Sequence, residues 1–586
     1  MSPKTPESAK DETIRETSCI DLAIERGEDA IVTLPDNGHI SLTGTIKNEQ
    51  IGNREAVAAA PGRFRSFAIM AGLCSAVFVA ALNQTIVATA IPTICNELKS
   101  SSGYAWISAA YLLSNAIAAP IWSKTSDIWG RKLILLSAVA LYFCASIVCA
   151  CSQSMKMLIV GRTFQGTAGG GLIQIVYATI SDIYSMRSRT FYFGLVQMMW
   201  AVAGGIGPVT GGTLAQYASW RWIFWINLPI TGLSFAVLLA FLDVHNPKTK
   251  LLPGLQVVDW YGSLSILSFM VLLLLGLNFG GSTFAWNSTV VICLLAFGTV
   301  MIVVFLLSEK RAQYPLIPLY IFRHPSNIAV LVIGFMHDWC VFSTEFYLPL
   351  YFQSVKAASP VQSGVLIMPI TFTQAVIGIV TGLIVYKTGR YIEILWAGVV
   401  MLALGNGLYI SLNAASPLGK IVAFEIIAAT GAGFLFQPPL IALQAHVAPK
   451  DTASATATLG LVRNLATSLA IVIGGVLFSN GMNSQKAEYL GKGLSANLTQ
   501  TFSGPSAAAN VMLVGTISDP MQQMAVKDAF ADSLRGVWIL STCTAACAVL
   551  ACGFISKQVL SKVHVEVRTG LEKNEPERNI PLETQA

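Results

Sequence analysis

Charged residues are scarce in this chain, and their scarcity sets its broad class. Asp, Glu, Lys and Arg make up 12% of the 586 residues, hydrophobic residues make up 54%, and the mean hydropathy is +0.62. Soluble domains carry roughly 25% charged residues, so these values exclude a soluble globular protein and indicate one built for a membrane. The net charge of +6 is spread over loops and tails, which argues against nucleic acid as a partner.

Motifs for chemistry are also missing. No G-x-x-x-x-G-K-[ST] loop occurs, so the chain offers no site for the nucleotide that a primary pump hydrolyses. The six histidines are scattered without metal-ligand spacing, and no nucleophile, base and orienting group gather in a motif. We therefore expect no enzyme activity, no metal and no cofactor. Most of the eleven cysteines lie inside apolar segments, which favours packing and implies no disulfide framework.

Apolar segments near the ~20 residues that cross a bilayer as a helix are, by contrast, abundant. Fourteen are predicted, at 67–92, 104–123, 133–151, 157–180, 192–214, 222–242, 260–280, 287–307, 327–350, 362–386, 393–412, 421–447, 455–479 and 535–556. An even number of spans places both termini on one side. Lys and Arg gather in the loops of that side, so both termini are predicted to be cytoplasmic. We expect the cell membrane, with a vacuolar or vesicle membrane as the alternative.

Two pairs of segments repeat along the chain at nearly one offset. RTFQGTAGGGLIQ at 162–174 aligns with EIIAATGAGFLFQ at 425–437, which matches Gln174 with Gln437. SKTSDIWGRK at 123–132 aligns in the same way with GLIVYKTGRY at 382–391. A duplicated six-span unit follows, and two bundles related by pseudo-symmetry suit alternating access to a site between them. The predicted parts are a disordered tail at 1–65, a bundle at 66–243, a linker with two extra spans at 244–326, a second bundle at 327–556 with a long external connection at 481–534, and a tail at 557–586.

Four motifs resemble those of the major facilitator superfamily. They are the loop signature after span 2 (SKTSDIWGRK), the span 4 motif with an intramembrane arginine (LIVGRTFQGTAGGG), the antiporter motif of span 5 (GGIGPVTGG) and a signature of 14-span drug:proton antiporters (WRWIFWINLP). Ser123 and Ala203 stand where the family patterns have glycine. Together the motifs resemble those of the fungal efflux pumps for toxins and drugs.

The resemblance implies an all-α membrane protein with the major facilitator fold, made of 14 transmembrane helices in two six-helix bundles plus two inserted central helices. It also implies a monomeric secondary active transporter that exports small organic compounds in exchange for protons. A proton-coupled importer of iron-siderophores or other metabolites is an alternative. A non-transporting membrane sensor is an alternative from another class.

Two of these motifs have roles that the resemblance implies. The loop signature would act as a conformational latch between states, formed by Asp127, Gly130, Arg131 and Lys132; the alternative is that its bases only set topology. The antiporter motif leaves one face of span 5 bare and weakens its hydrogen bonds, at Gly204, Gly207, Pro208, Gly211 and Gly212. Weaker hydrogen bonds let the helix bend. In the family such a bend supports export; the alternative is that the glycines serve packing alone.

Ionisable residues inside spans are costly, so each is a hypothesis for the site. Asp338 lies ~16 Å into its span at a 1.5 Å rise per residue, near the middle of the bilayer, and is the best candidate for the proton carrier. A purely structural pairing with His337 or Arg463 is the alternative. Further candidates for proton coupling are Glu345 and Glu425, and Glu425 matches Arg162 in the repeat. Arg162 with Gln165 is another candidate. The alternative is that the Arg162 side chain extends to the outer surface.

The stretch AALNQTIVATAIP at 80–92 departs from the family pattern, because Asn83 stands where the pattern has an acid. An amide cannot exchange a proton near neutral pH, so another carboxylate has to do so. Side chains that we expect to line a substrate cavity are Asn83, Gln84, Thr85, Trp106, Tyr111, Gln174, Trp200 and Gln437. Asn83-Gln84-Thr85 is also a glycosylation pattern, but we expect it inside the bilayer. The predicted glycosylation sites are Asn287 and Asn497, on the outside.

Overall fold

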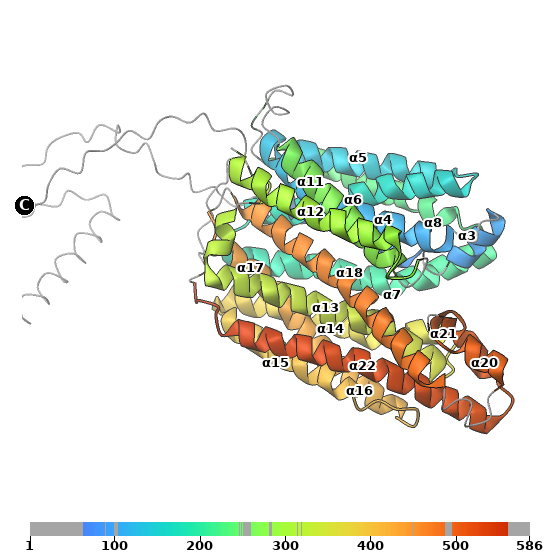
Figure 1. The fold of residues 1–586 in the computed structure, drawn as a ribbon. Helices are drawn as coiled ribbons and strands as arrows, with labels where there is room; N and C mark the ends of the chain where they lie inside the picture. The colour runs from blue at the N-terminus through green and yellow to red at the C-terminus, as the bar shows by residue number, and fades with distance from the viewer. Residues whose placement is uncertain are drawn as a thin grey trace, which may run out of the picture. The chain divides into compact units, whose positions relative to one another are not determined.

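A computed structural model describes residues 62–560, apart from 88–89, 99–102, 245–246, 248, 250–258, 281–283, 313–314, 318, 449–450, 487–494, 505 and 559. The predicted tails lie almost wholly outside the described residues. The described part is helical and contains no β-strand (Figure 1). The all-α prediction is therefore confirmed.

The first bundle is built from six long helical segments joined by short connections. Its elements are α2 (Arg63–Thr85), α3 (Ile91–Glu97), α4 (Gly103–Trp129), α5 (Arg131–Ala150), α6 (Met155–Ile183), α7 (Met186–Tyr217), α8 (Trp222–Trp225) and α9 (Asn227–Phe241). Helix α4 packs along α6, α5 packs on α6, and α2 packs on α7 and α9. We call the end that carries the α4–α5 turn the inner end, because it is the predicted cytoplasmic end, and the opposite end the outer end.

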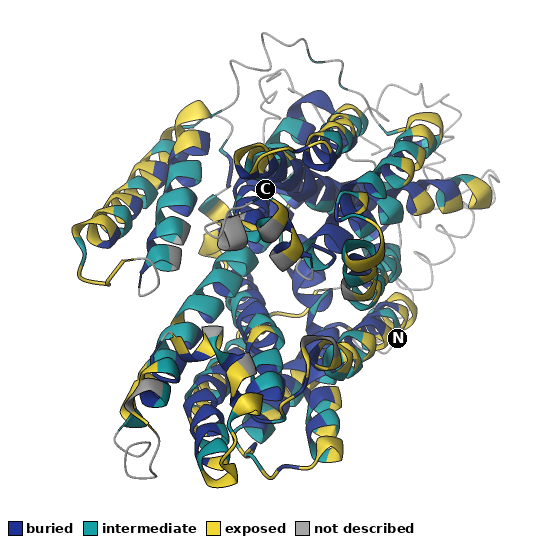
Figure 2. Ribbon diagram, turned by 90° about the vertical axis from the view of Figure 1, so that its right-hand side faces the viewer, coloured by how far each residue is buried: buried dark blue, intermediate teal, exposed yellow. Residues whose placement is uncertain are grey.

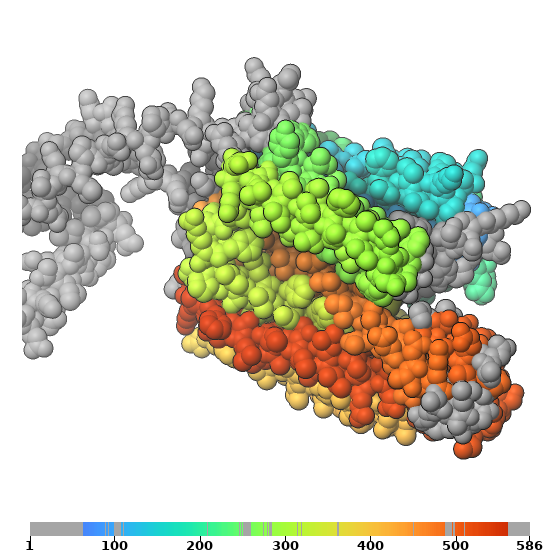
Figure 3. Space-filling model, in the orientation of Figure 1, coloured from blue at the N-terminus to red at the C-terminus, as the bar shows by residue number. Residues whose placement is uncertain are grey.

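The second bundle follows an inserted helical hairpin. The hairpin is α11 (Trp260–Phe279) and α12 (Thr289–Arg311), followed by η1 (Leu319–Arg323). The bundle comprises α13 (Pro325–Ser354), α14 (Pro360–Thr388), α15 (Ile392–Tyr409), α16 (Leu418–Leu435), α17 (Pro438–Gln444), α18 (Thr452–Ser484) and α22 (Pro520–Cys552). Helix α11 contacts α4 of the first bundle and α18 of the second, and Figure 3 shows the hairpin in green beside both.

The structure has a helix at each of the fourteen predicted spans. Among the described residues, twelve helical segments have the length and hydropathy of a membrane span. The two others are α4 and α6, which are 27 and 29 residues long. Their sequences contain many polar and glycine residues. Figure 2 shows exposed residues on the helix faces that point away from the protein interior, and buried residues inside. This pattern is expected for helices whose exposed faces meet lipid.

Glycines on α6 explain why α4 and α6 approach so closely. A Cβ atom added at Gly166 would lie 2.2 Å from the carbonyl oxygen of Tyr111, and one at Gly170 would lie 2.2 Å from that of Asn115. The two backbones therefore pack with no side chain between them, the arrangement that small residues permit in membrane helices. The motif LIVGRTFQGTAGGG thus sets the spacing of the helices that carry much of the candidate site.

The connection predicted at 481–534 differs from the structure. Helix α18 continues to Ser484, and short helices follow, namely α20 (Ala496–Thr501), α21 (Ser506–Ala509) and η3 (Val511–Thr516). Helix α22 begins at Pro520, well before the predicted 535, and Asp519 Oδ1 caps it by accepting from Met521 N at 2.9 Å. Charged residues in its first turns hide this extension from hydropathy, whereas proline at the first helical position and an N-cap aspartate mark it.

Candidate functional site

Arg162 lies in a closed polar cage in the outer half of the first bundle. Its side chain is buried, and Nη1 donates to Gln165 Oε1 at 2.8 Å. Nε donates to the carbonyl oxygen of Ile107 at 3.1 Å, and Nη2 donates to that of Asn83 at 3.4 Å. The guanidinium also lies 4.3 Å from the ring centroid of Tyr111. Arg162 therefore turns inward, beside Gln165, and does not extend to the outer surface.

The ligands of that guanidinium among the described residues are all neutral. Asn83, at the position of the family's acid, is fully buried, and its Nδ2 donates to Asn227 Oδ1 at 2.8 Å. Thr85 Oγ1 donates to the carbonyl oxygen of Ala203 at 3.0 Å, which ties the end of α2 to α7. The part of this stretch at residues 80–87 thus lies at a helix contact inside the bundle. The sequon there cannot be glycosylated in this state, because the acceptor amide of Asn83 is buried and already hydrogen-bonded.

The motif WRWIFWINLP closes the outer end of the same bundle. Asn227 belongs to it, and Trp220 Nε1 donates to Glu97 Oε2 at 2.7 Å. Arg221 pairs with Glu97 at 2.5 Å and stacks on Trp220 at 4.4 Å from the ring centroid. The hydrogen bond from Arg221 lowers the pKa of the Glu97 carboxyl below its usual value. Sequence reasoning matched this motif to the family but assigned its residues no contacts.

Asp338 forms a second cluster with two basic side chains, on the helices of the second bundle. Its Oδ1 lies 2.8 Å from His337 Nδ1 and 3.5 Å from Arg463 Nε. His337 Nε2 lies 3.1 Å from the carbonyl oxygen of Ala432 on α16, and Arg463 Nη2 donates to that of Phe436 at 3.1 Å. The side chains of Asp338 and Arg463 keep 12% and 18% exposure, so this ion pair is partly open, unlike the Arg162 cage.

The other two candidate acids lie apart from this cluster. Glu345 is two turns farther along α13 and half-buried. Glu425 is fully buried on α16, and neither of its carboxyl oxygens has a hydrogen-bond partner among the described residues. The structure therefore brings Asp338, His337 and Arg463 together, and leaves Glu345 and Glu425 at separate places.

The loop signature folds into a buried ion-pair network at the inner end. Arg131 is 1% exposed, and its guanidinium lies 2.5 Å from Asp127 Oδ1 and 2.6 Å from Asp182 Oδ2. Gly130 has φ +93°, a conformation that favours glycine, and so permits the sharp turn between α4 and α5. Lys132 turns away and donates to the carbonyl oxygen of Leu239. Asp182 is the partner that sequence reasoning missed.

Direct hydrogen bonds join the two bundles at the inner end. Gln444, the last residue of α17, accepts from Arg189 Nη1 at 2.8 Å, and its Nε2 donates to Ser181 Oγ at 3.0 Å and to Thr456 Oγ1 at 2.9 Å. Ser123 Oγ donates to the carbonyl oxygen of Ala453 at 3.0 Å. We call the four residues Gln444, Arg189, Ser181 and Thr456 the inner clamp. The structure is therefore of a state closed at its inner end, and no sequence motif marked Gln444.

The antiporter motif lies on α7 where this helix meets two others. A Cβ atom added at Gly207 would lie 2.1 Å from Thr85 Oγ1 of α2, and one at Gly204 would lie 3.2 Å from Thr371 of α14. A Cβ at Gly212 would meet nothing within 4 Å. Gly211 lies on the same helix, and the side chain of Pro208 lies outside the described part. Gly207 therefore allows close packing within the first bundle, and Gly204 allows it across to the second.

The described side chains that were predicted to line a cavity lie at several helix contacts. Gln437 Nε2 donates to the carbonyl oxygen of Gly378, and Gln174 lies against Gly460 of α18, so both are at helix contacts. Tyr111 is fully buried in the Arg162 cage, while Trp200 is half-buried in the apolar core. Gln84 is half-buried at the end of α2, and the side chain of Trp106 lies outside the described part.

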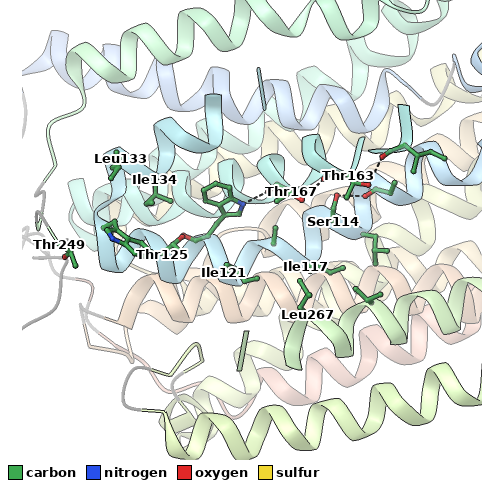
Figure 4. Close-up of a pocket in the computed structure, with 17 residues that line it drawn as sticks. Ser114, Ile117, Ile121, Thr125, Leu133, Ile134, Thr163, Thr167, Thr249 and Leu267 are labelled. Carbon is green, nitrogen blue, oxygen red and sulfur yellow. Dashed lines mark hydrogen bonds between the residues drawn. The ribbon is translucent and has the colours of Figure 1, made fainter. Parts of the chain in front are cut away.

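A cavity of about 820 Å³ lies elsewhere, between the first bundle and the inserted hairpin (Figure 4). It is lined by residues of α4, α5, α6 and α11 with Thr249, and none of the predicted site residues is among them. The hydroxyls of Thr163 and Thr167 bond carbonyl oxygens of their own helix, as does that of Ser114. The lining therefore favours apolar molecules and carries no group that exchanges a proton.

The two sequons predicted to carry sugars are at Asn287 and Asn497. Asn287 is exposed, as a glycosylation site requires. The side chain of Asn497 lies outside the described part. Glycosylation at either position stays a prediction.

Comparison with known proteins gives consistent matches over most of the chain. The family model described as Major Facilitator Superfamily matches residues 73–475. The efflux pump dotC of Dothistroma septosporum is 41% identical over 505 residues, which cover 86% of each chain. The MFS-type transporter ppz2 of Metarhizium majus is 38% identical over 86% of this chain and 87% of its own. Among solved structures, the proton:xylose symporter XylE aligns with a TM-score of 0.54 at 12% identity, over 85% of this chain and 98% of that one.

Proposed function

The chain belongs to the major facilitator superfamily, and from this premise we propose that it is a secondary active transporter that exports small, largely apolar organic compounds in exchange for protons. Export is supported by the 41% identity to a protein named as an efflux pump, over most of both chains. Family membership also argues for a transporter over an enzyme or a sensor. We place both termini in the cytoplasm, in the cell membrane, because of the loop charges.

The observation that carries the proton step is the Asp338 cluster. A carboxylate in the middle of a span that is still partly accessible can take up and release a proton as its surroundings alternate. Asn83 replaces the acid that the family has in the first span, and no carboxylate among the described residues contacts the Arg162 guanidinium. Arg162 then acts as a fixed charge that holds α2, α4 and α6 together, and its cage relays no proton.

The contacts suggest how protonation of Asp338 reaches the inner end. Ionised Asp338 attracts Arg463. Arg463 Nη2 also donates hydrogen bonds to the carbonyl oxygens of Leu435 and Phe436, where α16 ends. When Asp338 takes a proton, its attraction for Arg463 falls. The restraint that Arg463 places on the junction between α16 and α17 then changes. The next segment is α17, which ends at Gln444 of the inner clamp. We propose that the proton thus biases the equilibrium between states closed and open at the inner end.

Transport in sealed vesicles tests the proposal. A panel of neutral aromatic compounds is first screened for those that raise the unfolding temperature of the purified protein, and the strongest ligand becomes the probe. We expect inverted vesicles to accumulate this compound when their interior is acidic, and a protonophore to stop accumulation. Accumulation only by right-side-out vesicles would identify an importer, and accumulation indifferent to the protonophore would refute proton coupling.

A further inference from the structure

Glu425 and Arg162 occupy matching places in the two bundles, and the protein treats them in opposite ways. Each lies seven residues from the start of its helix, Met155 of α6 and Leu418 of α16, which is ~10 Å from the outer end at 1.5 Å per residue. Both are buried, with relative exposures of 1% for Arg162 and 0% for Glu425. The repeat has therefore placed one ionisable group at the same depth in each bundle.

Arg162 is held by a set of polar ligands, whereas Glu425 has none among the described residues. A guanidinium cannot lose its proton in a protein, so its burial requires the carbonyl and amide oxygens that surround it. A carboxylate can avoid the same cost by taking a proton, because a neutral acid is far easier to bury than an ion. The lack of ligands around Glu425 is what a protonated carboxyl permits and an ionised one does not.

Two more polar groups without partners lie on the neighbouring helix. Asn406 Oδ1 and the Tyr409 hydroxyl, both on α15 and both buried, have no hydrogen-bond partner among the described residues. Helices α15 and α16 pack tightly, since a Cβ added at Gly405 would lie 2.3 Å from the Cα of Ala428. This register brings Asn406 and Tyr409 level with Glu425. A buried polar group costs free energy unless a ligand or a proton satisfies it, and these three lie on one packed helix pair.

Among the residues that the structure describes, no cation on the packed helices pairs with Glu425. Lys420, on the same helix, donates to the carbonyl oxygen of Ser411 and lies 5.4 Å from the ring centroid of Phe424. Arg535 of α22 donates to the carbonyl oxygen of Ile410. From α13, His337 faces α16 but bonds Ala432, and Glu345 is half-buried elsewhere on its helix. From α14, Tyr386 and Lys387 lie in its last turn at the inner end, as does Glu393 in the first turn of α15.

We propose that Glu425, with Tyr409 and Asn406, forms a second proton-binding site, separate from Asp338 and loaded while the inner end is closed. A hydronium ion from the outer medium gives its proton to the carboxylate and leaves as water, and the carboxyl returns that proton to cytoplasmic water after the inner end opens. The inference rests on the proposed proton-driven export, and it adds one proton to each cycle.

Infrared spectroscopy tests the protonation without any transport. The protein is locked at its inner end by a disulfide between Ser123→Cys and Ala453→Cys, whose native side chain and carbonyl are in contact. We expect the carbonyl band of a protonated carboxyl at neutral pH, and its loss in Glu425→Gln. Glu425→Gln imitates the neutral acid in shape, so it should fold. If the locked protein and its Glu425→Gln form have the same carbonyl bands, Glu425 is ionised and the proposal is wrong.

Stoichiometry separates this proposal from the function on which it rests. In proteoliposomes, the gradient of the probe compound that just balances an imposed pH gradient gives the number of protons per molecule. We expect this number to fall by one in Glu425→Gln while export continues. An unchanged number would overturn the second site and leave proton-driven export intact. A wild-type gradient indifferent to pH would overturn the proposed function itself.

Discussion

Removing the Gln444 side chain should open the inner end of the protein. Gln444 joins Arg189, Ser181 and Thr456, and so links α17 to both bundles. A hydrogen bond to a charged group contributes ~1.5–3 kcal/mol and a neutral one ~0.5–1.5 kcal/mol. Gln444→Ala also leaves the buried guanidinium of Arg189 with one fewer acceptor. We therefore expect the state closed at its inner end to lose about 3 kcal/mol relative to the open state.

Such a loss changes the ratio of the two states by about 100-fold, since ~1.4 kcal/mol is a factor of ten. The assay follows alkylation of Ala453→Cys, at a position buried in the inner contact, by a membrane-impermeant maleimide. Mass spectrometry of the labelled peptide excludes the native cysteines. We expect labelling to quicken in Gln444→Ala, up to the limit set by the open state.

A matched control is Gln437→Ala. Gln437 is another buried glutamine of the same segment, but it donates to Gly378 of its own bundle and does not belong to the inner clamp. Its loss should leave labelling of Ala453→Cys within a few-fold of the parent. Equal labelling rates in Gln444→Ala and the parent protein would refute the inner clamp as the element that closes this end.

Four further substitutions test the proton step and two of the contacts described above. Asp338→Asn should abolish pH-driven transport in vesicles while binding of the probe compound persists. Coupling retained in Asp338→Asn would move the proton step to another acid. Asn83→Asp should keep transport, with at most an altered pH profile. Glu97→Gln should lower thermal stability by at most about 1 kcal/mol, because the pair is nearly half-exposed. Since the folded-state pKa of Glu97 is lowered, this difference should be present at neutral pH and vanish as pH falls through that pKa, and a pH-independent difference in unfolding temperature would contradict the pairing. Gly166→Ala should destabilise the protein by roughly 1–3 kcal/mol or more, since the new Cβ meets the backbone of α4, and an unchanged unfolding temperature would contradict that contact.

The positions of the membrane helices could be predicted because their signal is local. Long apolar runs give a helix at each of fourteen places, and the motif glycines of α6 foretell its close packing on α4. The first turns of α22 escaped because charged residues there resemble a loop in hydropathy. An aspartate followed by proline, at Asp519 and Pro520, was the available signal.

The site was predictable only where a residue type is rare for its place. An acid in mid-span, Asp338, and an arginine in a span, Arg162, stand out in any membrane sequence, and the structure gives both specific partners. Gln444 and Asp182 did not stand out, because polar residues near helix ends are ordinary. Their roles come from partners 255 and 51 residues away, which only the packed fold brings together.

In the proposed exchange, outward movement of the compound and inward movement of protons are one process. Proteoliposomes that hold the probe compound and a trapped pH-sensitive dye test it most directly, as the compound flows out down its own gradient. We expect the interior to acidify in step with efflux, and Asp338→Asn to abolish the pH change. Efflux with no pH change, or with an interior that turns alkaline, would contradict exchange for protons.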